Sequence, residues 1–262
     1  MVADEMYYPG DPDELRRSLQ RAVADTPVVS GSARVVVGPY GSYDLTLSYV
    51  MHALKAAANV QPARILLLAP PNTPTEGRAL LPESAAFATP FGSLPVDSGI
   101  LHQLIGSSTL FEIDEFSHLR DHSIETMLPA LHYLFGPIPI IPVLVGKMAP
   151  SMLRHTARVL STTLKRQDCI TVVSANLSGF ATPREADARA RGVIRLLLES
   201  PGEKILHAME TLENPPRSLW PIILGHLLAE PSSRPLILDS GTFETDYDGD
   251  TGSVVFAAIA YT

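Results

Sequence analysis

Residues that can hold a metal or move a proton gather in one short segment, which contains His118, Asp121, His122 and Glu125. On one continuous helix, the spacings of four and three residues would place His118, His122 and Glu125 on a single face. Two imidazoles and a carboxylate on one face favour either a transition-metal site or an acid–base pair of His122 and Glu125. The spacing differs from that of the zinc proteases, and the structural alternative is that Asp121 caps the helix after it.

Polar side chains also follow three apolar runs that are typical of buried strands. Tyr40 and Tyr43 follow the first run, Asn72 follows the second, and Asn176 follows a later one. In open α/β sheets, ligands bind beyond the carboxyl ends of strands, so these side chains are candidate ligand contacts. The glycine-rich segment around Tyr40 lacks the phosphate-binding glycine patterns, which excludes an ordinary nucleotide loop. A plain strand-to-helix turn is the structural alternative.

The elements that must position these residues follow from hydrophobic periodicity. Apolar runs of four to eight residues alternate with segments of helical period, giving about seven strands and six helices. This alternation predicts an α/β fold: one three-layer domain over residues 1–262 with a mixed, mostly central β-sheet. The segment Asp11-Pro-Asp-Glu14 is the expected start of the first helix, with an acidic or capping residue before Leu15. The run at 139–145 contains prolines, which predicts a strand that lies at a sheet edge or starts late. The expected strands cover residues 33–37, 64–69, 83–89, 139–145, 170–174, 234–239 and 253–261.

Charge and composition exclude several classes of partner. The net charge of −8 disfavours nucleic acid and anionic membrane, which attract Lys/Arg-rich faces. The single cysteine, Cys169, leaves no intrachain disulfide and no Cys-x-x-Cys zinc motif, and a buried structural thiol is expected. Prolines interrupt the longest apolar stretch, and the first residues lack the layout of a signal peptide. The cytoplasm is therefore the expected location.

Read in chain order, a series of segments resembles the Memo family, whose bacterial members are also called AmmeMemoRadiSam system protein B. The family is similar to the catalytic subunits of LigB-type extradiol dioxygenases, which are non-haem iron enzymes. The resemblance implies a mixed-sheet α/β fold with a pocket at the strand ends. It spans nearly the whole chain and rests on Tyr7-Tyr-Pro9, Pro39-Tyr-Gly-Ser-Tyr43, Leu68-Ala-Pro-Pro-Asn-Thr73, Thr89-Pro-Phe-Gly92, Asp121-His-Ser-Ile-Glu125, Ile141-Pro-Val-Leu-Val-Gly146, Ser174-Ala-Asn-Leu-Ser178 and Val254–Tyr261.

The chain departs from this family where the resemblance implies metal ligands. Tyr40 and Asn72 stand at the two strand-end histidine positions, and Asn176 and Gly179 replace an aspartate and a histidine. Arg217 falls near a family cysteine. A metal needs several imidazole or ionisable donors in one shell, and arginine cannot ligate at all. The family's metal site is therefore expected to be degenerate, with no metal and no other cofactor.

Three functions remain open for this pattern. The first is a metal-free protein that binds a small molecule or a protein partner at the strand ends, through Tyr43, Asn72, Asp121, Asn176 and Arg217. The second is a metal-independent enzyme acting on a small carbonyl-containing or aromatic substrate. There His122 is the acid or base, Glu125 orients it and Tyr40 assists. The third is a metal-dependent oxidoreductase with a site relocated to His118, His122 and Glu125 or Asp121.

Overall fold

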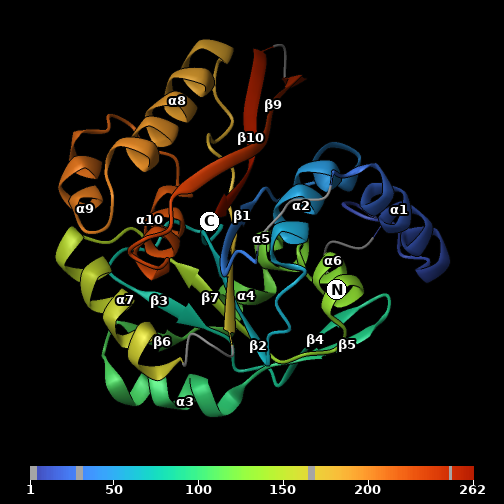
Figure 1. Cartoon of the computed structure of the whole chain (residues 1–262), viewed down its shortest axis with the longest axis horizontal. Helices are drawn as coiled ribbons and strands as arrows, with labels where there is room; N and C mark the ends of the chain where they lie inside the picture. Colours follow the sequence, from blue (N-terminus) through green and yellow to red (C-terminus); the bar gives the residue numbers. More distant parts are fainter. Residues whose placement is uncertain (1–4, 28–31, 165–168, 248–249) are drawn as a thin grey trace.

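A mixed β-sheet of eight strands runs through the centre of the described structure (Figure 1). The computed structural model describes residues 5–27, 32–164, 169–247 and 250–262. The α/β fold and the mixed central sheet predicted from the apolar runs are confirmed. From one edge of the sheet to the other, the strands are β6 (Phe111–Ile113), β3 (Ala79–Leu81), β7 (Ile140–Val145), β2 (Arg64–Ala69), β8 (Cys169–Ser174), β1 (Val35–Gly38), β10 (Asp250–Tyr261) and β9 (Pro235–Tyr247).

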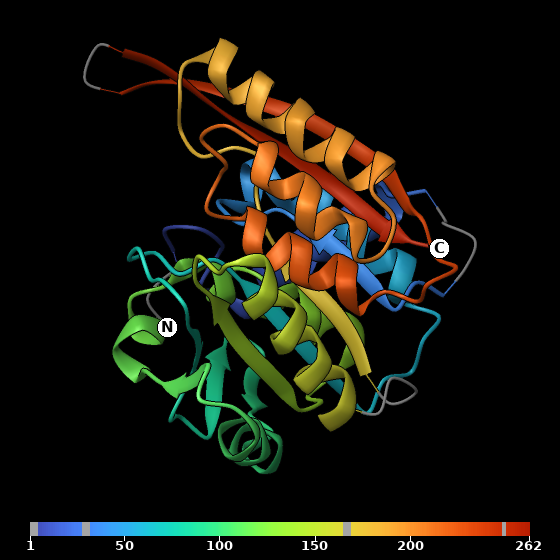
Figure 2. The same cartoon turned by 90° about the vertical axis from the view of Figure 1, so that its left-hand side faces the viewer.

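Helices cover both faces of the sheet, which gives a three-layer arrangement (Figures 1 and 2). On one face, α1 (Pro12–Asp25) packs on α2 (Tyr43–Ala57), which lies against β1 and β10. On the other face, α7 (Pro150–Thr163) packs against α10 (Leu219–Leu228), which lies over β8 and β1. No helix in the described ranges is both long and apolar enough to cross a membrane. The remaining helices are α3 (Ser98–Ser107), α4 (Glu115–Leu119), α5 (His122–Glu125), α6 (Leu128–Phe135), α8 (Pro183–Glu199), α9 (Lys204–Ala208) and the 3₁₀ turn η2 (Met209–Thr211).

Four neighbouring strands, β7, β2, β8 and β1, run parallel, so their carboxyl ends meet at one edge of the sheet. These strands are buried along their whole length, apart from the first residue of β2. Parallel strands covered on both faces need apolar side chains throughout, which explains the unbroken apolar runs of the sequence. The loops after β1, β2 and β8 carry Tyr40, Asn72 and Asn176, and the sheet brings them to this common edge.

The prolines of β7 predict a strand that lies at an edge or starts late, and the edge position is wrong, because β7 lies between β3 and β2. The backbone direction explains how a proline is accommodated there. The carbonyl of Ile140 accepts from the N–H of Asp97 at 2.9 Å, on the side away from β2. Pro142 is two residues further on and faces the same side. Within the described ladder, β3 pairs with Leu144 and Val145, so the missing N–H of Pro142 falls before that pairing begins.

His118 and His122 do not share one helix, so the single predicted face of metal-binding or catalytic side chains is wrong. His118 belongs to α4, whereas His122 opens α5. Asp121 is the N-cap between them, and its carboxylate accepts from the N–H groups of Ser123 and Ile124 at 2.7 and 3.4 Å. A capping carboxylate satisfies N–H groups that would otherwise have no partner at a helix start. The structural alternative for Asp121 is therefore confirmed.

The last two strands form a hairpin that extends well past the rest of the sheet (Figure 2). Both strands are longer than the predicted ranges 234–239 and 253–261, because β9 continues to Tyr247 and β10 starts at Asp250. The helix α8 lies along this hairpin and packs on β10. A separate two-stranded sheet is formed by β4 (Ala86–Thr89) and β5 (Gly92–Pro95).

Candidate functional site

The side-chain amide of Asn176 ties the end of β8 to the loop after β1. Its Oδ1 accepts from the backbone N–H of Tyr40 at 3.2 Å, and its Nδ2 donates to the carbonyl of Tyr40 at 3.2 Å. Asn176 is only 7% exposed, and buried polar atoms require partners. Both ends of this amide are engaged, so Asn176 acts as a brace that positions Tyr40.

The carboxylate of Asp121 positions the loop after β2 in a similar way. Its Oδ2 accepts from the backbone N–H of Asn72 at 2.8 Å, while its Oδ1 faces the N–H and hydroxyl of Ser123. The Ser123 hydroxyl also lies 3.1 Å from the carbonyl of Pro70. The carbonyl of Ser123 accepts from the hydroxyl of Ser174 at 2.6 Å, which links the start of α5 to β8 as well. Both carboxylate oxygens of Asp121 are therefore occupied by hydrogen bonds within the protein.

The amide nitrogen of Asn72 reaches the imidazole of His122. It donates to the carbonyl of Arg120 at 3.3 Å and lies 3.4 Å from Nδ1 of His122. Because a carbonyl can only accept, the same nitrogen is a donor toward the ring, and Nδ1 is the acceptor. A neutral imidazole of this kind carries its proton on Nε2 and can donate it to a ligand.

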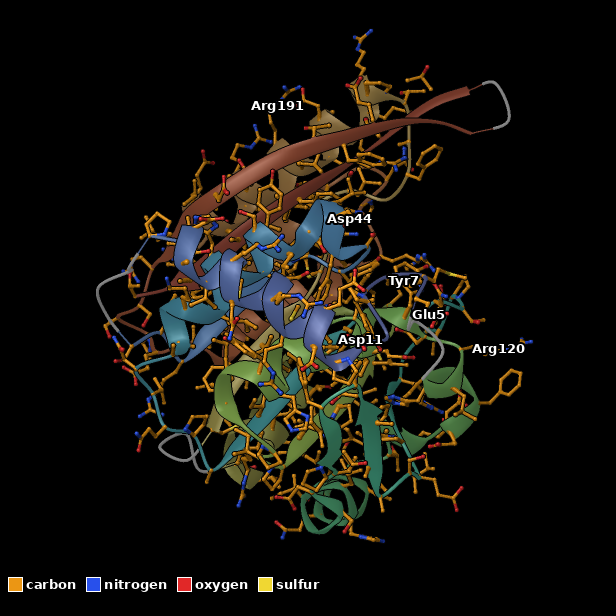
Figure 3. All side chains as sticks on the ribbon, turned by 90° about the vertical axis from the view of Figure 1, so that its right-hand side faces the viewer. Glu5, Tyr7, Asp11, Asp44, Arg120 and Arg191 are labelled. Carbon is orange, nitrogen blue, oxygen red and sulfur yellow. The ribbon has the colours of Figure 1, made fainter. Side chains whose placement is uncertain are left out.

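Two tyrosines enclose the His122 ring. The ring of Tyr7 is stacked on it with centroids 5.0 Å apart, and the ring of Tyr40 meets it edge-on at 5.5 Å. The carbonyl of Tyr7 accepts from the backbone N–H of Tyr43 at 2.7 Å, which holds the segment before α1 against α2. Figure 3 shows Tyr7 on the same side of the molecule as Arg120, the residue just before the α5 cap. Sequence reasoning assigned Tyr7 no role in the site, because its contact joins distant segments.

Burial and neighbouring charges set the protonation of this site. Burial lowers the pKa of His122, and the Asp121 carboxylate opposes that shift while the Arg217 guanidinium adds to it. Burial raises the pKa of the Tyr40 phenol, with Arg217 and the Ser218 hydroxyl acting in the opposite direction. Near pH 7 the imidazole is therefore neutral and the phenol is protonated.

Arg217 lies over the loop after β2. Its Nη1 donates to the carbonyls of Pro71, at 3.4 Å, and Asn72. The same residue lines a small cavity of about 150 Å³ together with Pro71, Lys147 and Trp220. The residue stays exposed despite these bonds, so its guanidinium retains donors that face solvent. Tyr7, Tyr40, Asn72, His122 and Arg217 are referred to below as the strand-end cluster.

Glu125 and Tyr43 lie beneath this cluster. The buried carboxylate of Glu125 accepts from the hydroxyl of Tyr8 at 3.1 Å. Tyr43 is 6% exposed, its ring lies 5.6 Å from that of Tyr8, and burial strongly raises its pKa. The structure places Tyr43 in the core, while Glu125 anchors the segment that carries Tyr7.

The donor set does not fit the metal ion that the resemblance to LigB-type enzymes implies. Asn176 and Asp121 are committed to backbone groups, and Arg217 adds a cation to the site. His118 lies apart, with its ring buried and its Nε2 at 3.1 Å from the carbonyl of Leu80 on β3. Among the described residues, no three His, Cys, Asp or Glu side chains form a group that could hold a metal. The relocated site built on His118 therefore finds no support.

Comparison with known proteins decides the family. The sequence profile described as Memo-like protein matches residues 2–219. This chain belongs to the Memo family. A MEMO1 family protein of Metallosphaera sedula is 25% identical over 264 residues, covering 95% of this chain and 93% of the relative. A MEMO1 family protein of Nitrosopumilus maritimus is 24% identical over 210 residues, covering 78% of this chain and 76% of the relative.

A solved structure shares the fold of this Memo-family chain. The crystal structure of the uncharacterized protein JW3007 from Escherichia coli K12 aligns with a TM-score of 0.58 and 13% sequence identity. The alignment covers 84% of this chain and 98% of that one, so the likeness extends over most of the sheet and its helices. At this identity the match concerns architecture alone, and the chemistry of this Memo-family member has to be argued from its own strand-end cluster.

Proposed function

We propose that this Memo-family protein binds a small ligand at the strand-end cluster without a metal ion. The observation that carries the proposal is the state of the imidazole of His122, which is neutral, stacked and bonded through Nδ1. Its Nε2–H is left as a donor, and the Arg217 guanidinium and the Tyr40 phenol are donors beside it. A site that offers donors favours a ligand that brings acceptors.

The absence of a metal from this proposal rests on how the side chains are used. Asn176 gives both amide ends to Tyr40, and Asp121 gives both oxygens to backbone groups near Asn72 and Ser123. A metal at the same place would have to break these bonds and would meet the positive charge of Arg217. Coordination would therefore remove stabilising hydrogen bonds and add electrostatic repulsion between the metal ion and Arg217.

The chemical class that fits best is a planar carboxylate. The Arg217 guanidinium is suited to a carboxylate, because its planar fork pairs with two oxygens. The parallel rings of Tyr7 and His122 form an aromatic wall against which a flat ligand can lie. Benzoate carries both features in the smallest form and serves as the probe.

Two measurements test this proposal. Elemental analysis of protein purified without chelators or a metal-binding tag is expected to show no stoichiometric iron, copper or zinc. Benzoate is expected to bind saturably in a titration followed by NMR, while benzyl alcohol binds much more weakly. Arg217→Gln is expected to weaken benzoate binding about tenfold or more, since a bond to a charged group is lost. Arg195→Gln, an exposed arginine on α8, is the matched control.

Either of two results would contradict the proposal. A stoichiometric metal would show that the scaffold bonds of Asn176 and Asp121 do not prevent coordination. Equal benzoate affinity in the wild type and the Arg217 variant would remove the cluster as the binding site.

A metal-independent enzyme is the second candidate, and the neutral state of His122 is the observation that favours it. An imidazole with a lowered pKa is unprotonated near pH 7 and is available as a general base. The substrate class in this reading is a small carbonyl-containing or aromatic molecule. With a substrate in hand, His122→Ala is expected to abolish turnover and Glu125→Ala to reduce it, whereas unchanged rates in both variants would remove the enzymatic role.

A further inference from the structure

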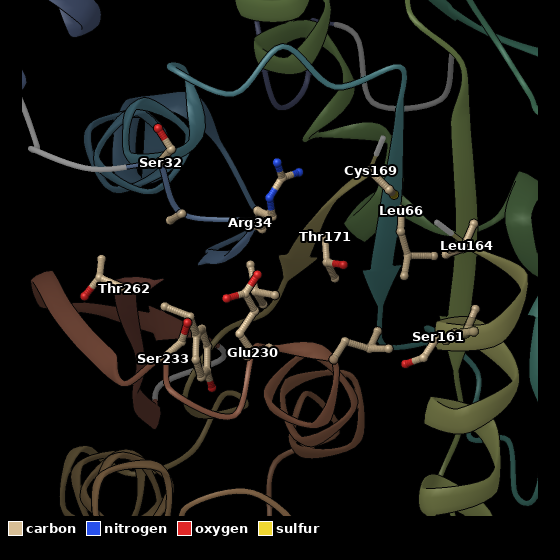
Figure 4. A pocket seen from close by; sticks show the side chains of 16 residues that line it. Ser32, Arg34, Leu66, Ser161, Leu164, Cys169, Thr171, Glu230, Ser233 and Thr262 are labelled. Atoms are coloured by element: carbon tan, nitrogen blue, oxygen red, sulfur yellow. The ribbon is translucent and has the colours of Figure 1, made fainter. Parts of the chain in front are cut away.

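Two neighbouring cavities lie at the opposite edge of the sheet from the strand-end cluster, near the amino ends of the parallel strands. The first has a volume of about 310 Å³. It lies between the starts of β1 and β8 on one side and the carboxyl ends of α7 and α10 on the other. Figure 4 shows Leu66, Leu164 and Cys169 on one side of it and Ser233 and Thr262 on the other. Its wall has an aliphatic part, formed by Val35, Leu66, Leu160, Leu164 and Leu228, and a polar part that includes the charged residues Arg34 and Glu230.

The second cavity has a volume of about 450 Å³ and is lined by arginines. Arg154 pairs with Glu203 at 2.9 Å, and Arg234 donates to the carbonyls of Pro231 and Ser233. Arg158 lies one turn along α7 from Arg154, and its guanidinium has no partner among the described residues. An exposed, unpaired guanidinium in a concave site is a ready partner for an anion.

The two cavities adjoin each other, because they share five lining residues: Ser161, Ala229, Glu230, Ser233 and Tyr261. His226 lines the second cavity and faces the Tyr261 hydroxyl at 3.1 Å. Burial lowers the pKa of His226 to about 4, with Arg234 adding to that shift, so this imidazole contributes no positive charge near pH 7. The positive charge of the second cavity therefore comes from its arginines.

We infer that these two cavities together bind a small amphipathic anion, with its apolar chain in the first cavity and its anionic head near Arg158 in the second. Each volume falls in the range of natural ligand sites, which is roughly 300 to 1,000 Å³. The aliphatic part of the first cavity, next to the arginines of the second, favours a ligand with an apolar chain and an anionic head. Glu230, in the shared wall, repels the head and so limits affinity. This site is separate from the proposed function and does not depend on it.

A chain-length series tests the apolar half of the site. Hexanoate, octanoate and decanoate are titrated by calorimetry, and each added methylene is expected to tighten binding roughly fourfold until the first cavity is full. Octylamine, with the same tail and the opposite charge, is expected to bind at least tenfold more weakly than octanoate. Octanoate should also slow alkylation of Cys169, the single cysteine of the chain, because that thiol lines the first cavity.

Charge variants test the polar half with effects of opposite sign. Arg158→Gln is expected to weaken octanoate binding about tenfold, whereas Glu230→Gln strengthens it about threefold or more. Both residues are exposed, so neither change disturbs the core. Arg17→Gln on α1 removes the same charge on the opposite face of the sheet and is expected to leave binding unchanged.

Four outcomes would overturn the inference. The first is equal binding of octanoate and octylamine, and the second is an affinity that does not change in the Arg158 variant. The third is octanoate saturation without protection of Cys169, which would place the ligand elsewhere. Sedimentation with phosphatidylglycerol vesicles separates a free amphiphile from a membrane lipid: cosedimentation without octanoate binding would also reject the inference.

Discussion

The ring of Tyr7 lies nearly parallel to the imidazole of His122, with an interplanar angle of 7° and a centroid distance of 5.0 Å. This contact joins the segment before α1 to the start of α5, so it connects the amino-terminal part of the chain to the carboxyl edge of the sheet. It also covers one face of the ring that the proposed function places at the centre of ligand binding.

Replacement of Tyr7 measures what this stack contributes. Tyr7→Ala is expected to lower the free energy of unfolding by about 1 kcal/mol beyond the loss of buried area, because the aromatic pair is removed. Tyr7→Phe keeps the ring and is expected to change stability far less. Urea denaturation supplies the free energies, and the ring-current shift of the His122 protons reports the stack. Equal shifts in both variants would show that the stack does not exist in solution.

The pKa of His122 is expected to lie below its ordinary value in an NMR titration. Arg217→Gln should raise that pKa, because a cation near the ring disfavours the protonated form and its removal relieves the repulsion. Arg120→Gln removes another positive charge, whose guanidinium lies over the Phe116 ring at 4.5 Å from its centroid, and serves as the control. A His122 pKa above its ordinary value would contradict the burial of this imidazole.

Asn176→Ala should destabilise the protein by about 1 to 3 kcal/mol, because it leaves the partly buried N–H and carbonyl of Tyr40 without their partner. Asn176→Asp keeps one acceptor but places a carboxylate against the Tyr40 carbonyl, so it is expected to be no better. Thermal and urea unfolding provide the comparison. A neutral effect of the alanine variant would mean that water replaces the amide and that the brace is dispensable.

His226 predicts a fall in stability at acidic pH. Burial lowers its folded-state pKa to about 4, so the unfolded chain takes up the proton first as the pH falls below about 6.5. The contribution of His226 to the free energy of unfolding is complete above about pH 6.5. It falls by about 3 kcal/mol in total as the pH is lowered toward 4. His226→Gln should flatten this part of the pH profile, while His207→Gln, at an exposed histidine, should not. Identical profiles for both variants would rule out the buried neutral histidine.

Gly225→Ala is expected to destabilise the protein, although this replacement usually stabilises a helix. Within a helix this change usually stabilises by up to about 1 kcal/mol, but a Cβ at Gly225 would lie 2.6 Å from Cγ2 of Val173 on β8. Overpacking of α10 against the sheet is expected to cost about 1 to 3 kcal/mol instead. Gly106→Ala on α3 meets no neighbouring atom and is the control. Partial rescue by Val173→Ala would locate the clash.

The agreement between sequence and structure follows the range of the interactions. β2 occupies its predicted residues and α1 starts within the predicted segment 11–14, with Asp11 as its cap, because both depend on local patterns. β3 and β6 escape prediction, since each is three residues long and exists through pairing with distant partners. Pro142 gives a wrong indication for a related reason. A proline is tolerated inside a sheet where the neighbouring strand does not pair at that residue, and the sequence near Pro142 does not show where that pairing begins.

The candidate site shows the same division. A shared position for Tyr40, Asn72 and Asn176 follows from the rule that strand ends collect ligand contacts, and the sheet does bring these loops to one edge. The tendency of aspartate to cap helices predicts the helix break at Asp121. The four-residue spacing of His118 and His122 favours the competing interpretation, a single continuous helix. The stack of Tyr7 on His122 has no local signal, because it depends on how the amino-terminal segment returns to the sheet.

The strand β8 has a consequence for how two ligands would share this molecule. Its first residue, Cys169, lines the first cavity, while Asn176, two residues past its end, braces the strand-end cluster. Six residues of strand span about 20 Å, which is more than a small ligand covers. Occupants of the two sites would therefore bind simultaneously and without competition. Any influence of one on the other would have to pass along a buried strand that is hydrogen-bonded on both sides.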